Sequence, residues 1–180
     1  RGMSSAASDV YKRQAITIQN EPLHDGNNPS MYMSSTEQAL FVKQSLGPTF
    51  LQNQIDTKII IYDHNADRID YPISVLNDLS ARQYIDGSAF HLYGGNISDL
   101  SVLKSAHPDK NLYFTEQWVG APGDLFGDLR WHIRNLIIGA SRNWCKTIIE
   151  WNLASDENQK PHTDGAVSYT HLRAHETDYY

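Results

Sequence analysis

The amino-acid sequence predicts an α/β fold, a partial (β/α)8 TIM barrel with parallel strands. Strand-like runs alternate with helix-like runs four times, and the series ends on a strand. Several strand-like runs are almost continuously apolar, which is typical of parallel strands buried on both faces. Polar side chains follow each of these runs, as they do at the rim of a barrel. An open doubly wound sheet is less favoured because the glycine-rich turns GxGxxG and GxxxxGK[ST] are absent from the sequence.

Short apolar and β-branched runs predict five strands. They cover 15–19, 58–62, 86–92, 111–115 and 145–151. The first run, AITIQ, ends abruptly in Asn20, Glu21 and a proline, so a carboxylate follows a strand that otherwise looks buried. A charged group there costs desolvation unless something holds it, which makes Glu21 a candidate reagent.

Helices are expected in the four intervals between these strands. The first begins at Ser34 or Ser35, where Ser35 and Gln38 have the spacing of a capping box, and Gly47-Pro48 predicts a kink or a break. The other three are expected within 73–84, within 97–106 and within 125–143. The last has the clearest amphipathic pattern in the chain, formed by Leu129, Ile133, Leu136, Ile137 and Ala140.

The composition excludes several classes of protein. The 180 residues are 40% hydrophobic and 20% charged with a formal net charge of −6, an ordinary composition for one globular domain. No apolar run is long enough to predict a membrane span, and the acidic balance gives no reason to expect nucleic acid. The single cysteine, Cys145, excludes an internal disulfide, and the histidines show neither HxH nor HExxH spacing. We therefore expect no metal and no cofactor.

The two ends of the sequence differ from the rest. SSAASDVYKRQ at 4–14 and VSYTHLRAHET at 167–177 resemble in-frame translations of transposase adapters from sequencing libraries. Such segments are left out of fold reasoning. We expect non-native tails at 1–14 and 167–180 around a partial barrel domain at 15–166 that was cut from a longer gene. Any export signal would then lie upstream of the sequence.

Amides, carboxylates and aromatic rings follow all five expected strands. They are Asn20 and Glu21, then Asp63, His64 and Asn65, then His91 and Tyr93, then Glu116, Gln117 and Trp118, and finally Trp151 and Asn152. Two glutamates at one rim suit glycoside hydrolysis, in which one carboxylic acid protonates the leaving oxygen and the other carboxylate attacks the anomeric carbon. Indole rings pack on sugar C–H faces, and amides both donate and accept hydrogen bonds. Each residue alone is more often an ordinary loop or core residue, so the prediction depends on the set.

The motifs together resemble one family. ITIQNEP resembles the fourth-strand acid/base motif of the clan of (β/α)8 glycoside hydrolases. The stretches FVKQSLGPTF, IIIYDHN, GSAFHLYGG, NLYFTEQWVGAPG and IIEWNLASDENQKPHTDG narrow the resemblance to glycoside hydrolase family 30, which contains glucosylceramidases and endo-β-1,6-glucanases. This resemblance implies that the five strands are the fourth to eighth of the barrel. The EQWVGAPG version is more similar to bacterial and fungal β-1,6-glucanases than to human-type glucosylceramidases.

The resemblance also implies roles for individual residues. Glu21 would be the general acid/base and Glu116 the nucleophile of a retaining β-glycosidase acting on β-linked glucose, of the endo-β-1,6-glucanase or glucosylceramidase type. The implied substrate-binding residues are Asn20, Asp63, His91, Tyr93, Trp151 and Asn152. Trp118 is added as a substrate-binding candidate because its indole ring suits a sugar face. The implied partner is a β-glucan or a glucosyl lipid, not nucleic acid, and the implied location is periplasmic or secreted. Two alternatives stay open: a non-catalytic carbohydrate-binding relative, and a retaining glycosidase of the same clan acting on β-mannan or β-1,4-glucan.

Overall fold

Five parallel strands form one sheet in the order β1-β2-β3-β4-β5 in the computed structural model, which describes residues 13–26, 31–119 and 123–151. The strands are β1 Ala15–Thr17, β2 Lys58–Asn65, β3 Ile85–His91, β4 Asn111–Glu116 and β5 Cys145–Ile148. The expected partial barrel is therefore confirmed. Most of the two expected tails, 1–14 and 167–180, lies outside the described residues, so the domain limits stay a prediction.

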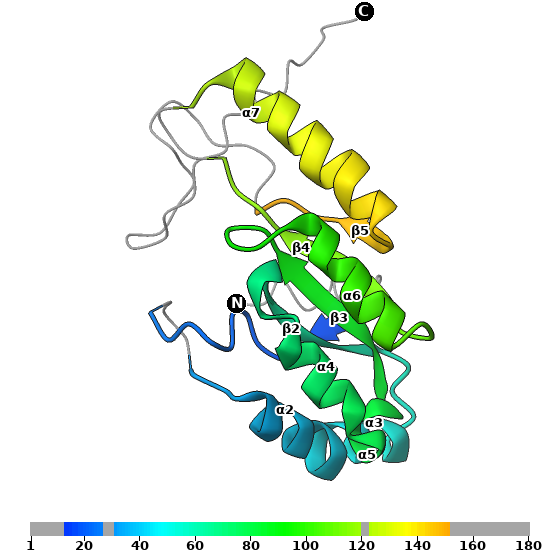
Figure 1. The fold of residues 1–180 in the computed structure, drawn as a ribbon. Helices are drawn as coiled ribbons and strands as arrows, with labels where there is room; N and C mark the ends of the chain where they lie inside the picture. The colour runs from blue at the N-terminus through cyan, green and yellow to red at the C-terminus, as the bar shows by residue number, and fades with distance from the viewer. Residues whose placement is uncertain (1–12, 27–30, 120–122, 152–180) are drawn as a thin grey trace, which may run out of the picture.

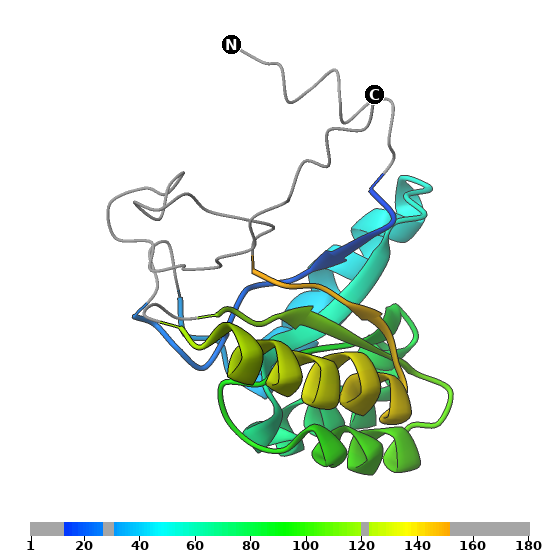
Figure 2. The ribbon, with the colours of Figure 1, turned by 90° about the horizontal axis from the view of Figure 1, so that it is seen from above.

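Helices connect each strand to the next. They are α2 Ser35–Phe41, the π-helical turn η1 Val42–Leu46, α3 Gly47–Gln52, the 3-10 turn η2 Ala66–Arg68, α4 Asp70–Asn77, α5 Leu79–Arg82, η3 Ile97–Asp99, α6 Leu100–Ala106, α7 Leu125–His132 and the π-helical η4 Ile133–Ala140. Parallel crossovers are almost always right-handed, so a strand order that never reverses places the helices on one face. Figures 1 and 2 show them on the outer side of a curled sheet.

The main core lies between the sheet and the helices. It combines strand residues with helix leucines, all at most 3% exposed, such as Ile61, Phe90, Phe114, Leu76 and Leu103. A second small cluster, Ile60, Ala89 and Tyr113, forms on the other face of the strands, as the alternation of side chains requires. Both faces of β2 are therefore covered, which explains the unbroken apolar run in its sequence.

The first helix begins where expected, but with a different cap. Ser34 is the N-cap, and it forms the capping box with Glu37 rather than Ser35 forming one with Gln38. The Ser34 N–H donates to Glu37 Oε2 at 2.8 Å. Gln38 is instead buried, and its Oε1 accepts from the Tyr62 N–H at 3.1 Å. The predicted pair was wrong because this contact with β2 places Gln38 in the core.

Of the kink or break predicted at Gly47-Pro48, the break is wrong. The helical path continues from Ser35 to Gln52, because the π-helical turn η1 carries the chain into α3. The Gly47 N–H donates to the carbonyl of Val42, five residues back, and Pro48 follows at the start of α3. Proline is tolerated in a first helical turn, where its missing N–H is not needed.

The amphipathic segment within 125–143 is helical as expected, but its apolar face is only partly covered. Leu136 and Ala140 are fully buried, whereas Leu129, Ile133 and Ile137 are each between 44% and 53% exposed. Among the described residues, no helix is long and apolar enough to cross a membrane.

Candidate active site

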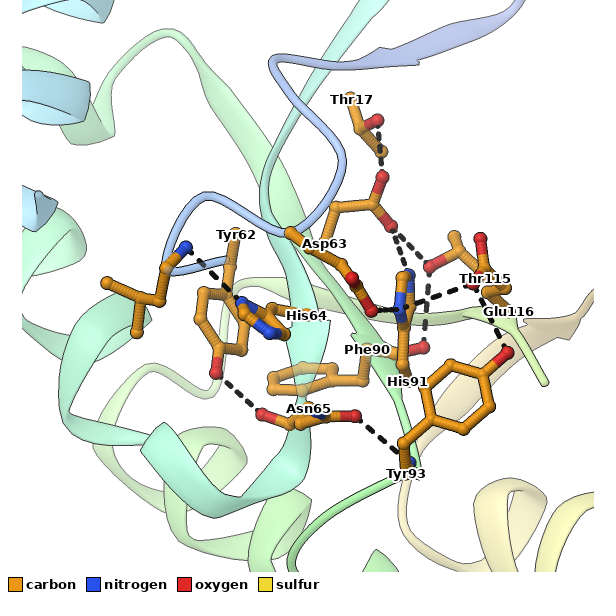
Figure 3. Close-up of polar contacts among 12 residues, drawn as sticks. Thr17, Tyr62, Asp63, His64, Asn65, Phe90, His91, Tyr93, Thr115 and Glu116 are labelled. Carbon is orange, nitrogen blue, oxygen red and sulfur yellow. Dashed lines mark hydrogen bonds and ion pairs between the residues drawn. The ribbon is translucent and has the colours of Figure 1, made fainter. Parts of the chain in front are cut away.

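The ends of four strands bring carboxylates and a histidine to one rim. Glu21 follows β1, Asp63 lies in β2, and His91 and Glu116 end β3 and β4. One oxygen of Glu21, one oxygen of Glu116 and one ring nitrogen of His91 all lie within 4.8 Å of one another. Figure 3 shows Asp63, His91 and Glu116 gathered at this rim, with Tyr93 beside Glu116. Two glutamates that are 95 positions apart in the sequence therefore meet at a single place.

The backbone turns Glu21 inward. Its φ is +48°, in the left-handed region that costs a non-glycine residue about 1–2 kcal/mol. Two hydrogen bonds hold this conformation, from the Glu21 N–H to the Asp63 carbonyl and from the His24 N–H to the Glu21 carbonyl, both 2.9 Å. Glu21 is only 9% exposed as a result. The carboxylate that looked misplaced in the sequence is held against the strand ends.

A β-bulge places Asp63. Tyr62 pairs with Ala89 and His64 with Phe90, so Asp63 is skipped in the register. Tyr62 and Asp63 have φ values of +73° and +63°, which is unusual for two successive non-glycine residues. Bulges of this kind redirect a side chain and are common next to active sites.

The Asp63 carboxylate links its own strand, β2, to three other strands, β1, β3 and β4. Its Oδ2 accepts from the Thr17 hydroxyl of β1 at 2.6 Å, and its Oδ1 accepts from the Thr115 hydroxyl of β4 at 2.6 Å. The same Oδ1 lies 3.2 Å from His91 Nε2. Burial alone would raise the pKa of Asp63, but the hydrogen bonds and charge of His91 and the two hydroxyls outweigh it and lower the pKa. Asp63 is therefore a buried anion.

His91 lies between two carboxylates. It is 1% exposed, with Nδ1 3.1 Å from Glu21 Oε1 and Nε2 3.2 Å from Asp63 Oδ1. Glu116 Oε1 is 3.9 Å from the same Nδ1. Burial would lower the pKa of His91, but the hydrogen bonds to Asp63 and Glu21 and the nearby negative charges raise it to about 9. At neutral pH His91 is thus a cation that donates from both ring nitrogens.

The phenol of Tyr93 contacts Glu116. The Tyr93 hydroxyl donates to Glu116 Oε1 at 3.2 Å. Burial raises the pKa of Glu116, the charge of His91 and the Tyr93 hydroxyl oppose this rise, and the net direction is upward. Burial and the Glu116 charge raise the pKa of Tyr93, so its phenol keeps its proton and remains a donor.

The remaining predicted substrate-binding residues lie around this cluster. The ring of Trp118 is 6.3 Å from that of Tyr93. Trp151 is 45% exposed, and its backbone N–H donates to the Gln117 carbonyl at 2.8 Å. Asn20 is exposed beside Glu21 and takes part in none of the contacts described above. Asn152 lies outside the described residues.

Glu21, His91 and Glu116 also form the one group in the described part of the chain whose spacing could hold a metal ion. Both His91 nitrogens face carboxylate oxygens and the pKa of the ring is raised, so a metal would have to displace a proton from His91 before it could bind. The arrangement suits hydrogen bonding better than coordination. The expected lack of a metal stays a prediction.

Two residues of the cluster were missed at the sequence level. Thr17 and Thr115 hold Asp63 through their hydroxyls, but both stand within β-branched, apolar runs. Threonine in such a run is typical of any strand, so the sequence carries no sign of the role of the hydroxyl.

Comparison with known proteins confirms the resemblance seen in the motifs. The model of the glycosyl hydrolase family 30 TIM-barrel domain matches residues 6–167. The endo-1,6-beta-D-glucanase of Neurospora crassa is 35% identical over 155 residues, which cover 84% of this chain and 31% of that protein. The endo-1,6-beta-D-glucanase neg1 of Aspergillus fumigatus is 37% identical over 153 residues, which cover 82% of this chain and 30% of that protein.

A solved structure shows the same similarity. The endo-β1,6-glucanase BT3312 matches with a TM-score of 0.82 and 39% sequence identity, over 87% of this chain and 36% of that one. The chain thus spans about a third of the length of the relatives it matches.

Proposed function

The chain belongs to glycosyl hydrolase family 30, and on that premise we propose that it supplies both catalytic carboxylates of a retaining β-glycosidase acting on β-1,6-linked glucose. The separation of Glu21 and Glu116 carries this proposal. Their nearest oxygens lie within 4.8 Å of each other. This approach of two oxygens favours the spacing of retaining enzymes, whose carboxyl groups stand about 5–5.5 Å apart, over that of inverting enzymes, whose carboxyl groups stand about 6.5–9.5 Å apart to admit a water molecule.

In the first step Glu21 gives its proton to the glycosidic oxygen while Glu116 attacks the anomeric carbon. The bond to the leaving group breaks, and a glycosyl ester forms on Glu116. In the second step the Glu21 carboxylate takes a proton from water, which attacks the anomeric carbon and releases Glu116. Tyr93 supports the ionised form of Glu116 through its 3.2 Å hydrogen bond.

Burial separates His91 and Asp63 from the other described residues of the predicted binding set. His91 and Asp63 are 1% and 7% exposed and bond to Glu21 and to each other, which favours a positioning role over contact with the sugar. Trp118 and Trp151 remain the proposed sugar platform, and Asn20 and Asn152 the proposed partners of sugar hydroxyls.

The proposed substrate is a β-1,6-glucan, because the relatives described above carry the name endo-1,6-beta-glucanase. Release outside the cell or into the periplasm stays a prediction from the family resemblance.

The proposal is tested by two substitutions in the complete enzyme that carries this segment. Glu116→Gln should abolish turnover of an aryl β-glucoside while leaving the circular dichroism spectrum unchanged. Glu21→Gln should be rescued by azide and yield a β-glycosyl azide, because azide needs no general base. Glu37→Gln makes the same chemical change at an exposed helix start, where glutamine also caps, and should keep full activity.

Three results would contradict the proposal. Ordinary activity of Glu116→Gln would remove the nucleophile assignment, and an α-glycosyl azide would indicate an inverting path. Binding of glucan without hydrolysis by the complete enzyme would favour a carbohydrate-binding protein. Product analysis on pustulan, cellulose, mannan and glucosylceramide then separates β-1,6-glucan from the alternative substrates.

A further inference from the structure

Two threonine hydroxyls hold the carboxylate of Asp63, one on each oxygen. Thr17 of β1 donates to Oδ2 and Thr115 of β4 donates to Oδ1, both at 2.6 Å. The Thr115 hydroxyl also lies 3.3 Å from the Phe90 carbonyl, but its hydrogen goes to the nearer, ionised acceptor. The dashed contacts in Figure 3 run from Thr17 through Asp63 to Thr115 and His91. Strands on either side of β2 therefore fix one buried carboxylate.

These hydroxyls set the rotation of the Asp63 carboxylate. The last torsion of an aspartate side chain has only broad preferences of its own, so its neighbours decide the orientation. Asp63 is 7% exposed, and a carboxylate so buried cannot turn without losing a hydrogen bond that water does not readily replace. In the orientation that the threonines hold, Oδ1 lies 3.2 Å from His91 Nε2. The hydroxyls thus direct the negative charge at one nitrogen of the imidazole.

The orientation of Asp63 passes to the other nitrogen of His91. With Nε2 held by Asp63, Nδ1 lies 3.1 Å from Glu21 Oε1 and 3.9 Å from Glu116 Oε1. Only the first distance is that of a hydrogen bond, so the ring donates to the proposed acid rather than to the proposed nucleophile. A ring that lost its contact with Asp63 could turn Nδ1 towards Glu116 instead. The two threonines therefore act on Glu21 through Asp63 and His91.

The contact between His91 and Glu21 also decides which oxygen of the acid carries the proton. Oε1 accepts the N–H of His91, so the proton that a neutral Glu21 carries is on Oε2. A general acid works only when its proton points at the leaving oxygen, and a displacement of about 1 Å can cost about a hundredfold in rate. This step rests on the proposed function of Glu21 as the acid.

We propose that Thr17 and Thr115 are positioning residues for the general acid: by fixing Asp63, and through it His91, they keep the transferable proton of Glu21 on Oε2. Neither threonine takes part in the chemical step itself. Their hydroxyls matter for the departure of leaving groups that need a proton and not for the attack by Glu116.

The test compares two substrates that share a sugar and differ in the leaving group. Phenyl β-glucoside needs a proton from the acid, whereas 2,4-dinitrophenyl β-glucoside releases a weakly basic phenolate without one. Their kcat/KM values are measured for the complete enzyme and for Thr17→Val and Thr115→Val, which keep the β-branched shape and remove the hydroxyl. Each variant should lower the ratio of phenyl to dinitrophenyl glucoside about tenfold, the effect of losing one hydrogen bond to a charged group. Thr17→Ser and Thr115→Ser keep the hydroxyl and should restore the ratio.

The control is Thr57→Val, which removes a hydroxyl that donates to the Arg13 carbonyl at 2.9 Å, just before β2 and at the opposite end of that strand from Asp63. It should leave the ratio unchanged. Alanine at 17 or 115 covers the case in which a valine variant does not fold, with the same fall in the ratio expected.

An equal loss on both substrates in the Thr17 and Thr115 variants would indicate a structural role alone and overturn the proposal, as would a ratio that stays the same. Glu21→Gln separates this failure from that of the proposed function, since it should lower the ratio more than either threonine variant. If Glu21→Gln leaves the ratio unchanged, the acid assignment is wrong. If it lowers the ratio and the threonine variants do not, only the positioning role is lost.

Discussion

His91 is expected to remain a cation up to about pH 9, and this charge should make the stability of the fold depend on pH. An unfolded histidine titrates near 6.5, and the folded pKa is about 9. Because the folded pKa is the higher one, the stabilisation is complete below about pH 6.5 and is lost as the pH rises towards 9. The difference between 6.5 and about 9 corresponds to roughly 3 kcal/mol of unfolding free energy.

Asp63→Asn isolates the charge from the hydrogen bonds. The asparagine oxygen can still accept from Thr115 and His91, and its NH2 group faces the Thr17 hydroxyl, which can accept as well as donate. The variant therefore keeps the geometry of the cluster and loses its central anion. We expect it to be about 2 kcal/mol less stable at pH 6, because a buried cation has lost a partner. The difference in unfolding free energy between Asp63→Asn and the unmodified protein should shrink as the pH approaches 9, because His91 then loses its charge in the unmodified protein.

Two measurements check this prediction. Urea unfolding of the parent and of Asp63→Asn between pH 6 and 8.5 gives the difference in stability, and the ring Cε1–H signal of His91 gives its pKa directly. Asp56→Asn is the matched control, since it removes an exposed carboxylate and should leave both values unchanged. A His91 that titrates at or below 6.5 in the unmodified protein would contradict this prediction, and so would a stability loss in Asp63→Asn that does not vary with pH.

Two further predictions concern packing and the nucleophile. A β carbon on Gly87 would meet the backbone carbonyl of Asn111 in the adjacent strand, so Gly87→Ala should cost about 2–3 kcal/mol in urea unfolding. The β carbon of Gly127→Ala meets the Asp124 side chain, so this variant should cost less than about 1 kcal/mol. Equal costs in the two variants would contradict the close approach of β3 and β4 at Gly87. Tyr93→Phe removes a donor that lowers the pKa of Glu116, so the acid limb of kcat/KM should move to higher pH and the maximum should fall about tenfold. An acid limb that does not move would show that this hydrogen bond leaves Glu116 unaffected.

The types and order of the elements could be predicted because each depends on a local pattern. The run KIIIY is apolar on both faces, and β2 is indeed covered on both faces. The cap of the first helix could not be chosen from sequence, since Ser34 with Glu37 and Ser35 with Gln38 have the same spacing. Only the contact of Gln38 with Tyr62, a residue 24 positions away, decides between them. β5 ends at Ile148, whereas the sequence predicted a strand up to Trp151.

The site could be predicted as a set of residues but not as a network. Parallel strands had to bring Glu21, Asp63, His91 and Glu116 to one rim. The sequence does not indicate that Asp63 and His91 bond to one another and to Glu21, because that depends on left-handed backbone at positions where no glycine marks it. The roles of Thr17 and Thr115 could not be predicted from the sequence either, because their hydroxyls reach Asp63 only once the bulge in β2 has formed.

The place of His91 suits the movement of charge in the proposed reaction. Before glycosyl transfer the negative charge is on Glu116, 3.9 Å from His91 Nδ1, and afterwards it is on Glu21, 3.1 Å from the same nitrogen. The negative charge thus moves towards the cation while the net charge around His91 stays the same. At an effective dielectric constant of about 20, the shorter distance favours the glycosyl-enzyme by about 1 kcal/mol. A cation nearer to Glu116 would favour the state before transfer instead, so the asymmetric position of His91 stabilises the acid after it has given up its proton.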